Sequence, residues 1–124
     1  MKKIINTKNA PGAIGPYSQG TEAGNLVFVS GQLPINMSTG ELETEIKAAT
    51  KASLDNVKAI LEEAGSSMDK VLKTTVFLKD INDFAAVNEV YGKYFTKDCP
   101  ARACFAVGKL PKDALVEIEV IACK

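Results

Sequence analysis

Apolar side chains recur at helical spacing over two segments, and the first runs from about Glu45 to Ala64. Gly65 follows directly and is a residue type that commonly ends a helix. The residues that recur at this spacing are Ile46, Ala49, Ser53, Val57, Ile60, Leu61 and Ala64, and all except Ser53 are apolar. Such a stripe predicts an amphipathic helix that buries one side against the rest of the fold.

The second helical segment is expected to begin after Asp80 or Asn82, either of which can serve as N-cap, and to reach about Phe95. Its apolar stripe comprises Phe84, Val87, Tyr91, Tyr94 and Phe95. Asn88 lies on this stripe, where an amide needs hydrogen-bond partners if it is buried. The residues alone favour a satisfied core amide or a boundary position for Asn88.

Several shorter segments alternate apolar and polar residues or are rich in β-branched residues, which predicts strands. These strands cover residues 3–5, 25–29, 71–78, 101–107 and 115–122. A further strand is expected to start near Pro16, since proline has no backbone N–H and is tolerated at the first residue or edge of a strand. Residues 34–40 are expected to form a polar loop. In the 71–78 strand, the side chains expected to face the helices are Leu72, Thr74, Val76 and Leu78.

The predicted order of elements is β-β-β-α-β-α-β-β, which indicates an α+β fold with two helices on one face of a mainly antiparallel sheet. With 124 residues, the chain is expected to form a single domain over 1–124. The second sheet face also has apolar residues. A bare apolar face predicts association with other subunits through the sheet.

The amino-acid composition limits the partners and the kinds of catalysis that this chain can support. Fifteen acidic and fifteen basic residues balance, so no global field favours nucleic acid or an anionic membrane. The chain has no histidine, which excludes Ser-His-Asp and Cys-His catalysis and histidine-bound zinc.

Cys99, Cys104 and Cys123 lack C-x-x-C spacing and indicate free thiols in a reducing compartment, so we expect a cytoplasmic protein. Neither a secretory signal at residues 1–7 nor a membrane-spanning apolar run is expected.

Arg102 is the only arginine in the chain, and small and apolar residues surround it in a predicted strand. A guanidinium keeps its charge when buried and then needs a partner, and its planar fork suits a carboxylate held by two hydrogen bonds. Arg102 is therefore a candidate ligand-binding residue. The alternative is a surface arginine in a weak ion pair.

Glu117 and Glu119 alternate with apolar residues, so their carboxylates point to one face of the last strand. If the last two strands form a hairpin, one of these acids shares a face with Arg102 and Cys104 and completes a small site for an anionic substrate. Alternatively, both belong to a solvated strand face. The sequence does not fix the register, so the choice between the two acids stays open.

Cys104 lies two residues after Arg102 on the same strand face. A nucleophilic thiolate normally needs a low pKa and a base such as histidine, so a packed free thiol is the better interpretation. Tyr17 and Ser30 offer hydroxyl groups to a ligand. Gly31 is either a simple bend or a point where a backbone or ligand approaches closely.

Ordered motifs over nearly the whole chain resemble the RidA/YjgF/YER057c/UK114 family. Each motif alone is weak, but the ordered set at these spacings is specific. The motifs are Ala10-Pro11, Ile14-Gly15-Pro16-Tyr17-Ser18-Gln19, Ser30-Gly31-Gln32, Leu54-Asp55-Asn56-Val57, Lys73-Thr74-Thr75-Val76-Phe77-Leu78-Lys79-Asp80, Asn82-Asp83-Phe84, Val87-Asn88, Tyr94-Phe95, Pro100-Ala101-Arg102, Leu110-Pro111, Val116-Glu117-Ile118-Glu119 and Ile121-Ala122.

The resemblance implies a chorismate-mutase-like α+β fold that assembles as a homotrimer, with the sheets packed inward and three clefts between subunits. It also implies hydrolysis of 2-imino acids, such as 2-iminopropanoate and 2-iminobutanoate, to 2-oxo acids and ammonia. No cofactor or metal is implied, and neither nucleic acid nor a membrane is expected as a partner.

Because Arg102 lies in the matching Pro100-Ala101-Arg102 motif, the resemblance implies that it holds the substrate carboxylate. Glu117 would orient or activate water, helped by the main-chain carbonyl of Cys104. The residues that would line the cleft are Tyr17, Ser30, Gly31 and Asn88, with Tyr17 from a neighbouring subunit. Residues 96–99 form a shorter segment than in familiar members, which is expected to alter the cleft rim and the substrate size.

Three other functions stay open. The first is a non-enzymatic trimer that uses Arg102 to bind a small carboxylate metabolite. The second is RNA cleavage or translation inhibition, activities of some family members, which neutral net charge and the lack of histidine and of an aromatic-basic patch disfavour. The third is a protein-interaction or chaperone-like role, which the sequence neither supports nor excludes.

Overall fold

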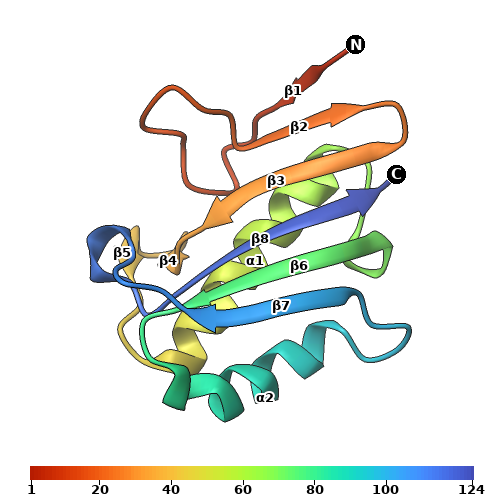
Figure 1. Ribbon diagram of the computed structural model, residues 1–124. Coiled ribbons are helices and arrows are strands. Elements are labelled where there is room, and N and C mark those ends of the chain that lie inside the picture. The colour runs from red at the N-terminus through yellow and green to blue at the C-terminus, as the bar shows by residue number, and fades with distance from the viewer.

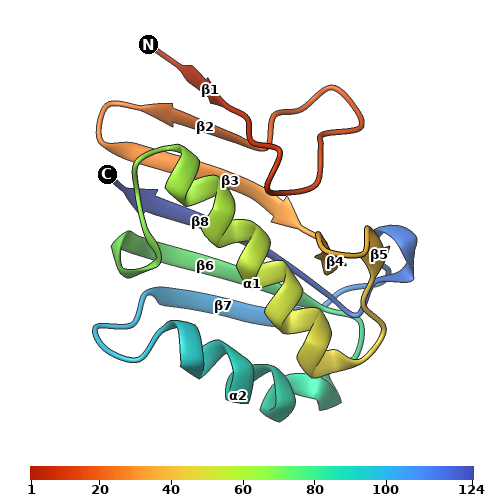
Figure 2. The same cartoon turned by 180° about the vertical axis from the view of Figure 1, so that it is seen from behind.

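A six-stranded sheet with two helices on one face forms this protein (Figures 1 and 2). The structure is a computed structural model that describes residues 1–124. The sheet order is β1-β2-β3-β8-β6-β7, and every neighbouring pair is antiparallel except β6 and β7. The elements are β1 (Lys3–Ile5), β2 (Gly20–Ala23), β3 (Leu26–Gln32), β4 (Ile35–Asn36), β5 (Glu41–Leu42), α1 (Ile46–Glu63), β6 (Val71–Leu78), α2 (Phe84–Tyr94), β7 (Ala101–Ala106) and β8 (Val116–Cys123). The predicted α+β fold is confirmed.

The last two strands do not form the hairpin that was one possibility from the sequence. Strand β6 lies between β7 and β8, and β7 runs parallel to β6 with Thr74 opposite Arg102. A parallel pair needs a crossover connection, which α2 provides between β6 and β7. Strand β8 then pairs with the other edge of β6. Figure 1 shows β7 at the sheet edge beside α2.

The N-terminal half differs from the prediction in three places. The segment around Pro16 is a loop, and strand β2 begins later, at Gly20. Strand β3 runs on to Gln32, past the predicted end at residue 29, with a register shift between Val29 and Gln32. Within the expected polar loop, residues 35 and 36 form β4, which pairs with β5 directly after the loop, with Ile35 opposite Leu42.

The ends of α1 follow local rules that the sequence reveals. The Glu45 carboxylate caps the N-terminus by accepting hydrogen bonds from the backbone N–H groups of Lys47, at 2.8 Å, and Ala48, at 3.1 Å. At the C-terminus, Gly65 has a φ of 79° and donates to the Glu62 carbonyl, while Ser66 N–H donates to the Leu61 carbonyl. This pair of bonds is a Schellman motif, so Gly65 ends the helix as predicted.

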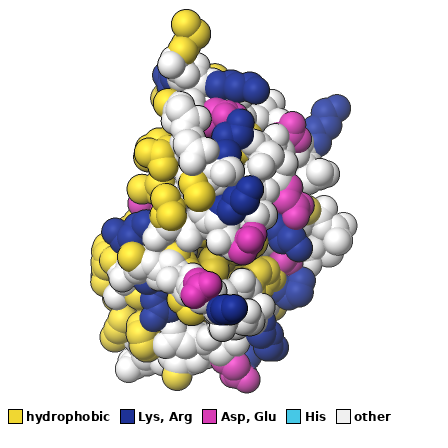
Figure 3. Space-filling view, turned by 90° about the vertical axis from the view of Figure 1, so that its right-hand side faces the viewer, with side chains coloured by type: hydrophobic (Ala, Val, Ile, Leu, Met, Phe, Trp, Pro, Cys, Tyr) yellow, Lys and Arg dark blue, Asp and Glu magenta, His cyan; other side chains and the backbone are white.

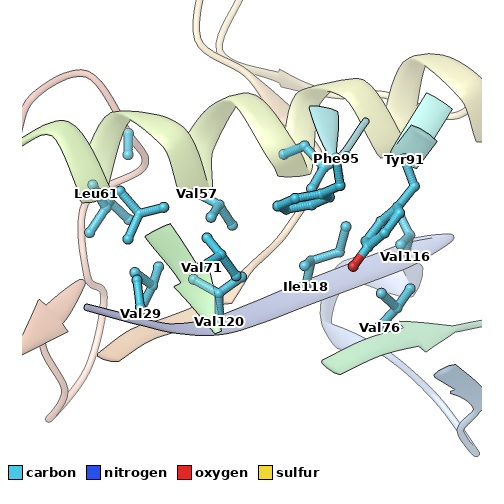
Figure 4. Close-up of a cluster of buried hydrophobic side chains, with 14 of the residues drawn as sticks. Val29, Val57, Leu61, Val71, Val76, Tyr91, Phe95, Val116, Ile118 and Val120 are labelled. Carbon is cyan, nitrogen blue, oxygen red and sulfur yellow. The ribbon is translucent and has the colours of Figure 1, made fainter. Parts of the chain in front are cut away.

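The hydrophobic core lies between the helices and one face of the sheet (Figure 4). Val76 and Leu78 of β6 and Ile118 of β8 are fully buried there. The start of β6 departs from the predicted alternation because its register shifts between Val71 and Lys73. Val71 is therefore 5% exposed, whereas Leu72, expected in the core, is 48% exposed.

The second face of the sheet has no helix over it. Leu26, Phe28 and Phe105 are exposed on this face, and Phe77 contacts Phe105 edge to face with ring centroids 5.5 Å apart. In the side view of Figure 3, hydrophobic side chains gather along the left margin, where this uncovered face lies. The bare apolar face predicted from the sequence is thus present. No helix is long and apolar enough to cross a membrane.

Candidate functional site

Arg102 lies on β7 and points to the helix-covered side of the sheet, as does its register partner Thr74. Its Nη1 donates a hydrogen bond of 2.7 Å to the Oδ1 of Asn88 on α2. The guanidinium carbon lies 5.3 Å from the ring centroid of Phe84 and 4.8 Å from that of Tyr91. An amide and two aromatic rings therefore orient this cation.

No carboxylate of the chain forms an ion pair with Arg102. All four ion pairs of the protein involve lysine side chains. The surface ion pair considered as an alternative for Arg102 is therefore wrong. Because only one of its N–H groups has a partner, the guanidinium retains donors for an external anion.

Glu117 lies on the other side of the sheet. It is opposite Phe77 in the register, and Phe77 contacts Phe105 on the uncovered face. The side chains of Arg102 and Glu117 therefore project from opposite faces of one chain. A shared face for Arg102 and an acid of β8 was conditional on a hairpin of β7 and β8, and this condition is not met because β6 lies between the two strands.

A cavity of about 810 Å³ surrounds Glu117. Its walls come from the loop between β1 and β2, the end of β3, the segment after β7 and the start of β8, which lie on the same side of the molecule in Figures 1 and 2. The predicted site residues that line it are Tyr17, Ser30, Gly31 and Glu117, together with Glu119. This cavity therefore gathers four of the seven predicted site residues.

Burial raises the pKa of Glu117 above its ordinary value, and the negative charge of Glu119 raises it further. Gly31 lies against the Glu117 side chain so closely that a Cβ at position 31 would be 2.9 Å from Cδ of Glu117. Glu117 is thus a half-buried carboxylate with a raised pKa, which is suited to accept and return a proton.

The loop that presents Tyr17 is held by buried hydrogen bonds. The Gln19 amide donates to the carbonyl oxygens of Thr7, Ala10 and Pro11 at 3.0, 3.3 and 2.8 Å, and its Oε1 accepts from Thr7 N–H at 2.7 Å. The Ser30 hydroxyl donates to the carbonyl of Ser18 at 2.6 Å. Tyr17 itself is 52% exposed at the cavity rim, where a ligand or another chain can reach it.

Cys104 lies opposite Val76 in the register and packs against the core beside Arg102. Burial raises the pKa of its thiol, and the Arg102 charge offsets part of this effect. This geometry supports the packed free thiol expected from the sequence.

The predicted site residues therefore form two groups. Arg102, Asn88 and Cys104 lie together on the helix side of the β7 edge, whereas the residues around Glu117 line the cavity. Sequence reasoning missed Phe84 and Tyr91 as neighbours of Arg102. Their spacing with Asn88 on one helical face was visible, but only the parallel pairing of β6 and β7 places that face over Arg102.

The groove between the two helices contains none of the predicted site residues. This groove, of similar volume at about 810 Å³, lies between α1 and α2 and is lined mainly by charged side chains. Its lysines are Lys47, Lys51, Lys58 and Lys93. No group of three or more histidine, cysteine, aspartate or glutamate side chains is placed to hold a metal ion.

Comparisons with known proteins agree with this fold. The family model described as Endoribonuclease L-PSP matches residues 7–124. A RutC family protein of Pyrococcus horikoshii is 55% identical over 100% of this chain and 99% of its own length. The protein of Escherichia coli K12 named 2-iminobutanoate/2-iminopropanoate deaminase is 52% identical, again over 100% of this chain and 99% of its own length. The crystal structure of E. coli TdcF with bound serine superposes with a TM-score of 0.94 at 49% identity, covering 98% of both chains.

These matches extend over the whole sheet and both helices. They define the class of protein as an α+β fold of the kind seen in TdcF. The chain belongs to the Endoribonuclease L-PSP family, which is the RidA/YjgF/YER057c/UK114 family that its motifs resemble.

Proposed function

We propose that this protein hydrolyses reactive 2-imino acids, such as 2-iminopropanoate and 2-iminobutanoate, to 2-oxo acids and ammonia. The observation that carries this proposal is Arg102, the only arginine, which is oriented by Asn88 and two rings yet has no carboxylate partner in the chain. A guanidinium so placed suits the carboxylate of a small substrate. The E. coli relative named for this deamination, at 52% identity, supports the same assignment.

The active site is proposed to be shared between subunits of a homotrimer. Within one chain the sheet separates Arg102 from Glu117, so one small substrate does not reach both side chains. Packing the uncovered faces of three sheets inward buries Phe28 and Phe105 and allows Arg102 of one subunit to approach the Glu117 cavity of a neighbour. Each of the three clefts then receives both groups, with Tyr17 at the rim.

In this mechanism Arg102 holds the substrate carboxylate and so fixes the imine carbon beside a water molecule, which is mainly a positioning effect. Glu117 takes a proton from the water as its oxygen attacks that carbon, helped by the Cys104 carbonyl, and a tetrahedral carbinolamine forms. The imine enters protonated at nitrogen, so Glu117 returns its proton to the amino nitrogen of the carbinolamine. The C–N bond then breaks as the hydroxyl proton passes back to Glu117 and the C=O bond forms, so the 2-oxo acid and ammonia leave, and the ammonia takes the proton from Glu117. The raised pKa of Glu117 favours these proton transfers. No cofactor enters these steps, and the free cysteines suit a reducing, cytoplasmic setting.

The test generates fresh imine with threonine dehydratase acting on serine and threonine, in the presence of semicarbazide as a competing trap. Wild type, Arg102→Ala and Lys58→Ala are compared for 2-oxo acid and ammonia release. Lys58→Ala removes one positive charge from the exposed side of α1, outside the cavity around Glu117, and serves as the matched control. We expect wild type and Lys58→Ala to restore the 2-oxo acid and Arg102→Ala to lose the activity while it stays folded.

Retained deamination in a folded Arg102→Ala variant would overturn the assignment of Arg102. A wild type that binds 2-oxobutanoate but releases no ammonia would favour the non-enzymatic carboxylate-binding trimer. The E. coli TdcF structure with bound serine, a small carboxylate, makes this second function worth the same assay. RNA degradation that survives Arg102→Ala would instead support the activity in the family's description.

A further inference from the structure

The ring of Tyr91 forms the buried side of the Arg102 environment. Its centroid lies 4.8 Å from the guanidinium carbon, and the tyrosine is 7% exposed. Phe84, on the same helix, is much more exposed and contacts the guanidinium at 5.3 Å. Asn88 fixes only one nitrogen of the guanidinium. Of the two rings beside the guanidinium, Tyr91 is therefore the buried one and the closer one.

Tyr91 is in turn held by Thr74. The phenol oxygen and the Thr74 Oγ1 are 2.8 Å apart in a buried hydrogen bond, and Thr74 is fully buried. Figure 4 shows the Tyr91 ring extending from α2 with its oxygen directed toward the sheet. Thr74 is also the residue opposite Arg102 in the β6–β7 register. The strand residue next to Arg102 thus fixes the ring on which Arg102 lies.

The chemistry of this contact argues for more than core packing. A buried phenol costs free energy unless its hydroxyl is hydrogen-bonded, whereas phenylalanine fills a similar volume without that requirement. Burial raises the pKa of Tyr91, so the ring stays neutral and contacts Arg102 through its π face, not through a phenolate charge. The hydroxyl therefore serves to fix the ring by its bond to Thr74.

We propose that Tyr91, held by Thr74, is a positioning residue that orients the Arg102 guanidinium toward the substrate carboxylate. The link to substrate rests on the proposed function, while the orientation of Arg102 is a property of the fold. Tyr91 does not touch the reacting atoms. Its loss weakens binding of the carboxylate more than the later proton transfers.

Phe95 provides a matched control. It packs against Tyr91 with ring centroids 4.6 Å apart and is 6% exposed, but it makes no cation–π contact with Arg102. Phe95→Leu and Tyr91→Leu each remove one aromatic ring from the same part of the core. A purely structural role for Tyr91 predicts similar effects of the two variants on activity once stability is taken into account.

The experiment uses the single arginine as a spectroscopic probe. Because Arg102 is unique, the Nε–Hε group of ¹⁵N-arginine-labelled protein gives one resonance. We expect the Tyr91 ring, with its centroid 4.8 Å from the guanidinium carbon, to shift this resonance upfield. We expect Tyr91→Leu to move this resonance downfield and Phe95→Leu to leave it in place. Thr74→Val and Tyr91→Phe are expected to give smaller shifts, and the double variant no more than either single one, since both remove the same hydrogen bond.

Kinetics complete the test. Tyr91→Leu is expected to raise KM about tenfold with a smaller change in kcat, a size suited to the loss of a desolvated cation–π contact. Phe95→Leu is expected to keep KM within about twofold. An unmoved Arg102 resonance in Tyr91→Leu would overturn the inference, as would equal KM changes in the two leucine variants. A wild type with no deaminase activity defeats the proposed function instead, and the resonance then still decides whether Tyr91 orients Arg102.

Discussion

Gly31 lies directly against the Glu117 carboxylate, so that a Cβ at position 31 would be 2.9 Å from Cδ of Glu117 and closer still to its Oε2. The glycine is needed here for a close approach, since its φ lies outside the left-handed region. The two residues belong to neighbouring strands, β3 and β8, near the register shift of β3. The position of the proposed catalytic carboxylate of Glu117 thus depends on residue 31 having no side-chain methyl group.

Gly31→Ala is expected to displace the Glu117 carboxylate and to lower kcat by about 100-fold, the cost typical of a catalytic group misplaced by an ångström. Stability should change little, because the atoms that must move are the end of a flexible side chain. The measurement is steady-state deamination together with thermal unfolding. Gly12→Ala is the matched control, since Gly12 lines the same cavity and a Cβ there meets nothing within 4 Å. An active Gly31→Ala enzyme would remove Glu117 from the mechanism.

Glu119→Gln is expected to shift the pH dependence of kcat. Glu117 must be ionised to take a proton from water, and its pKa is raised above 4.5 by burial and by the charge of Glu119. Activity of the wild type should therefore fall as the pH drops through a value above 4.5. Removing the Glu119 charge lowers the pKa of Glu117, so the acid limb of the pH–rate profile moves to lower pH.

Glu117→Gln is the companion variant and should lower kcat more than it weakens binding of 2-oxobutanoate. An acid limb that stays in place in Glu119→Gln would show that another group titrates. Glu41→Gln, on the exposed strand β5 and outside the cavity, controls for the loss of a surface carboxylate.

The sequence predicted what local rules determine. Gly65 ends α1 and apolar stripes place both helices, because capping and helical periodicity depend on residues close in the chain. The unique Arg102 and the bare sheet face were also visible without a structure. Chemical type and local spacing were sufficient in each of these cases.

The pairing of strands in the sheet was the main feature of the fold that could not be predicted from the sequence. Strands β7 and β8 follow each other in the chain, but in the sheet β6 lies between them. With this strand order and register, the side chains of Arg102 and Glu117 lie on opposite faces of the sheet. Pairing over long separations depends on the packing of α2, which no local pattern contains. The register shift that buries Val71 in place of Leu72 could not be predicted for the same reason. The sequence shows Gln19 only as part of a family motif, whereas in the structure its side chain organises the loop around Tyr17.

Gln19→Ala is expected to destabilise the protein by about 2–4 kcal/mol, because four hydrogen bonds are lost and buried backbone groups are left without partners. Hydrogen exchange of the Thr7 amide, which donates to Gln19, should accelerate more than that of amides in β6. Activity should fall because the loop that presents Tyr17 loosens. Gln32→Ala is the control, since Gln32 is also buried and lines the same cavity but makes one side-chain hydrogen bond, to the Ser30 carbonyl. Equal stability of the two variants would contradict the anchoring role of Gln19.

Ser53→Ala is expected to stabilise the protein by about 1 kcal/mol. Ser53 is fully buried in α1, and its hydroxyl is the only buried side-chain polar group without a hydrogen-bond partner, so replacing it with a methyl group removes a desolvation cost. Alanine also has the higher helix propensity. Ser66→Ala is the opposite case, because the Ser66 hydroxyl donates to the Cys123 carbonyl at 2.6 Å and its loss should cost about 1 kcal/mol. Denaturant midpoints measured at one protein concentration, so that subunit association stays constant, would separate the two variants by sign. A destabilised Ser53→Ala variant would mean that the hydroxyl has a partner, such as a buried water, and that this position of α1 is polar by requirement.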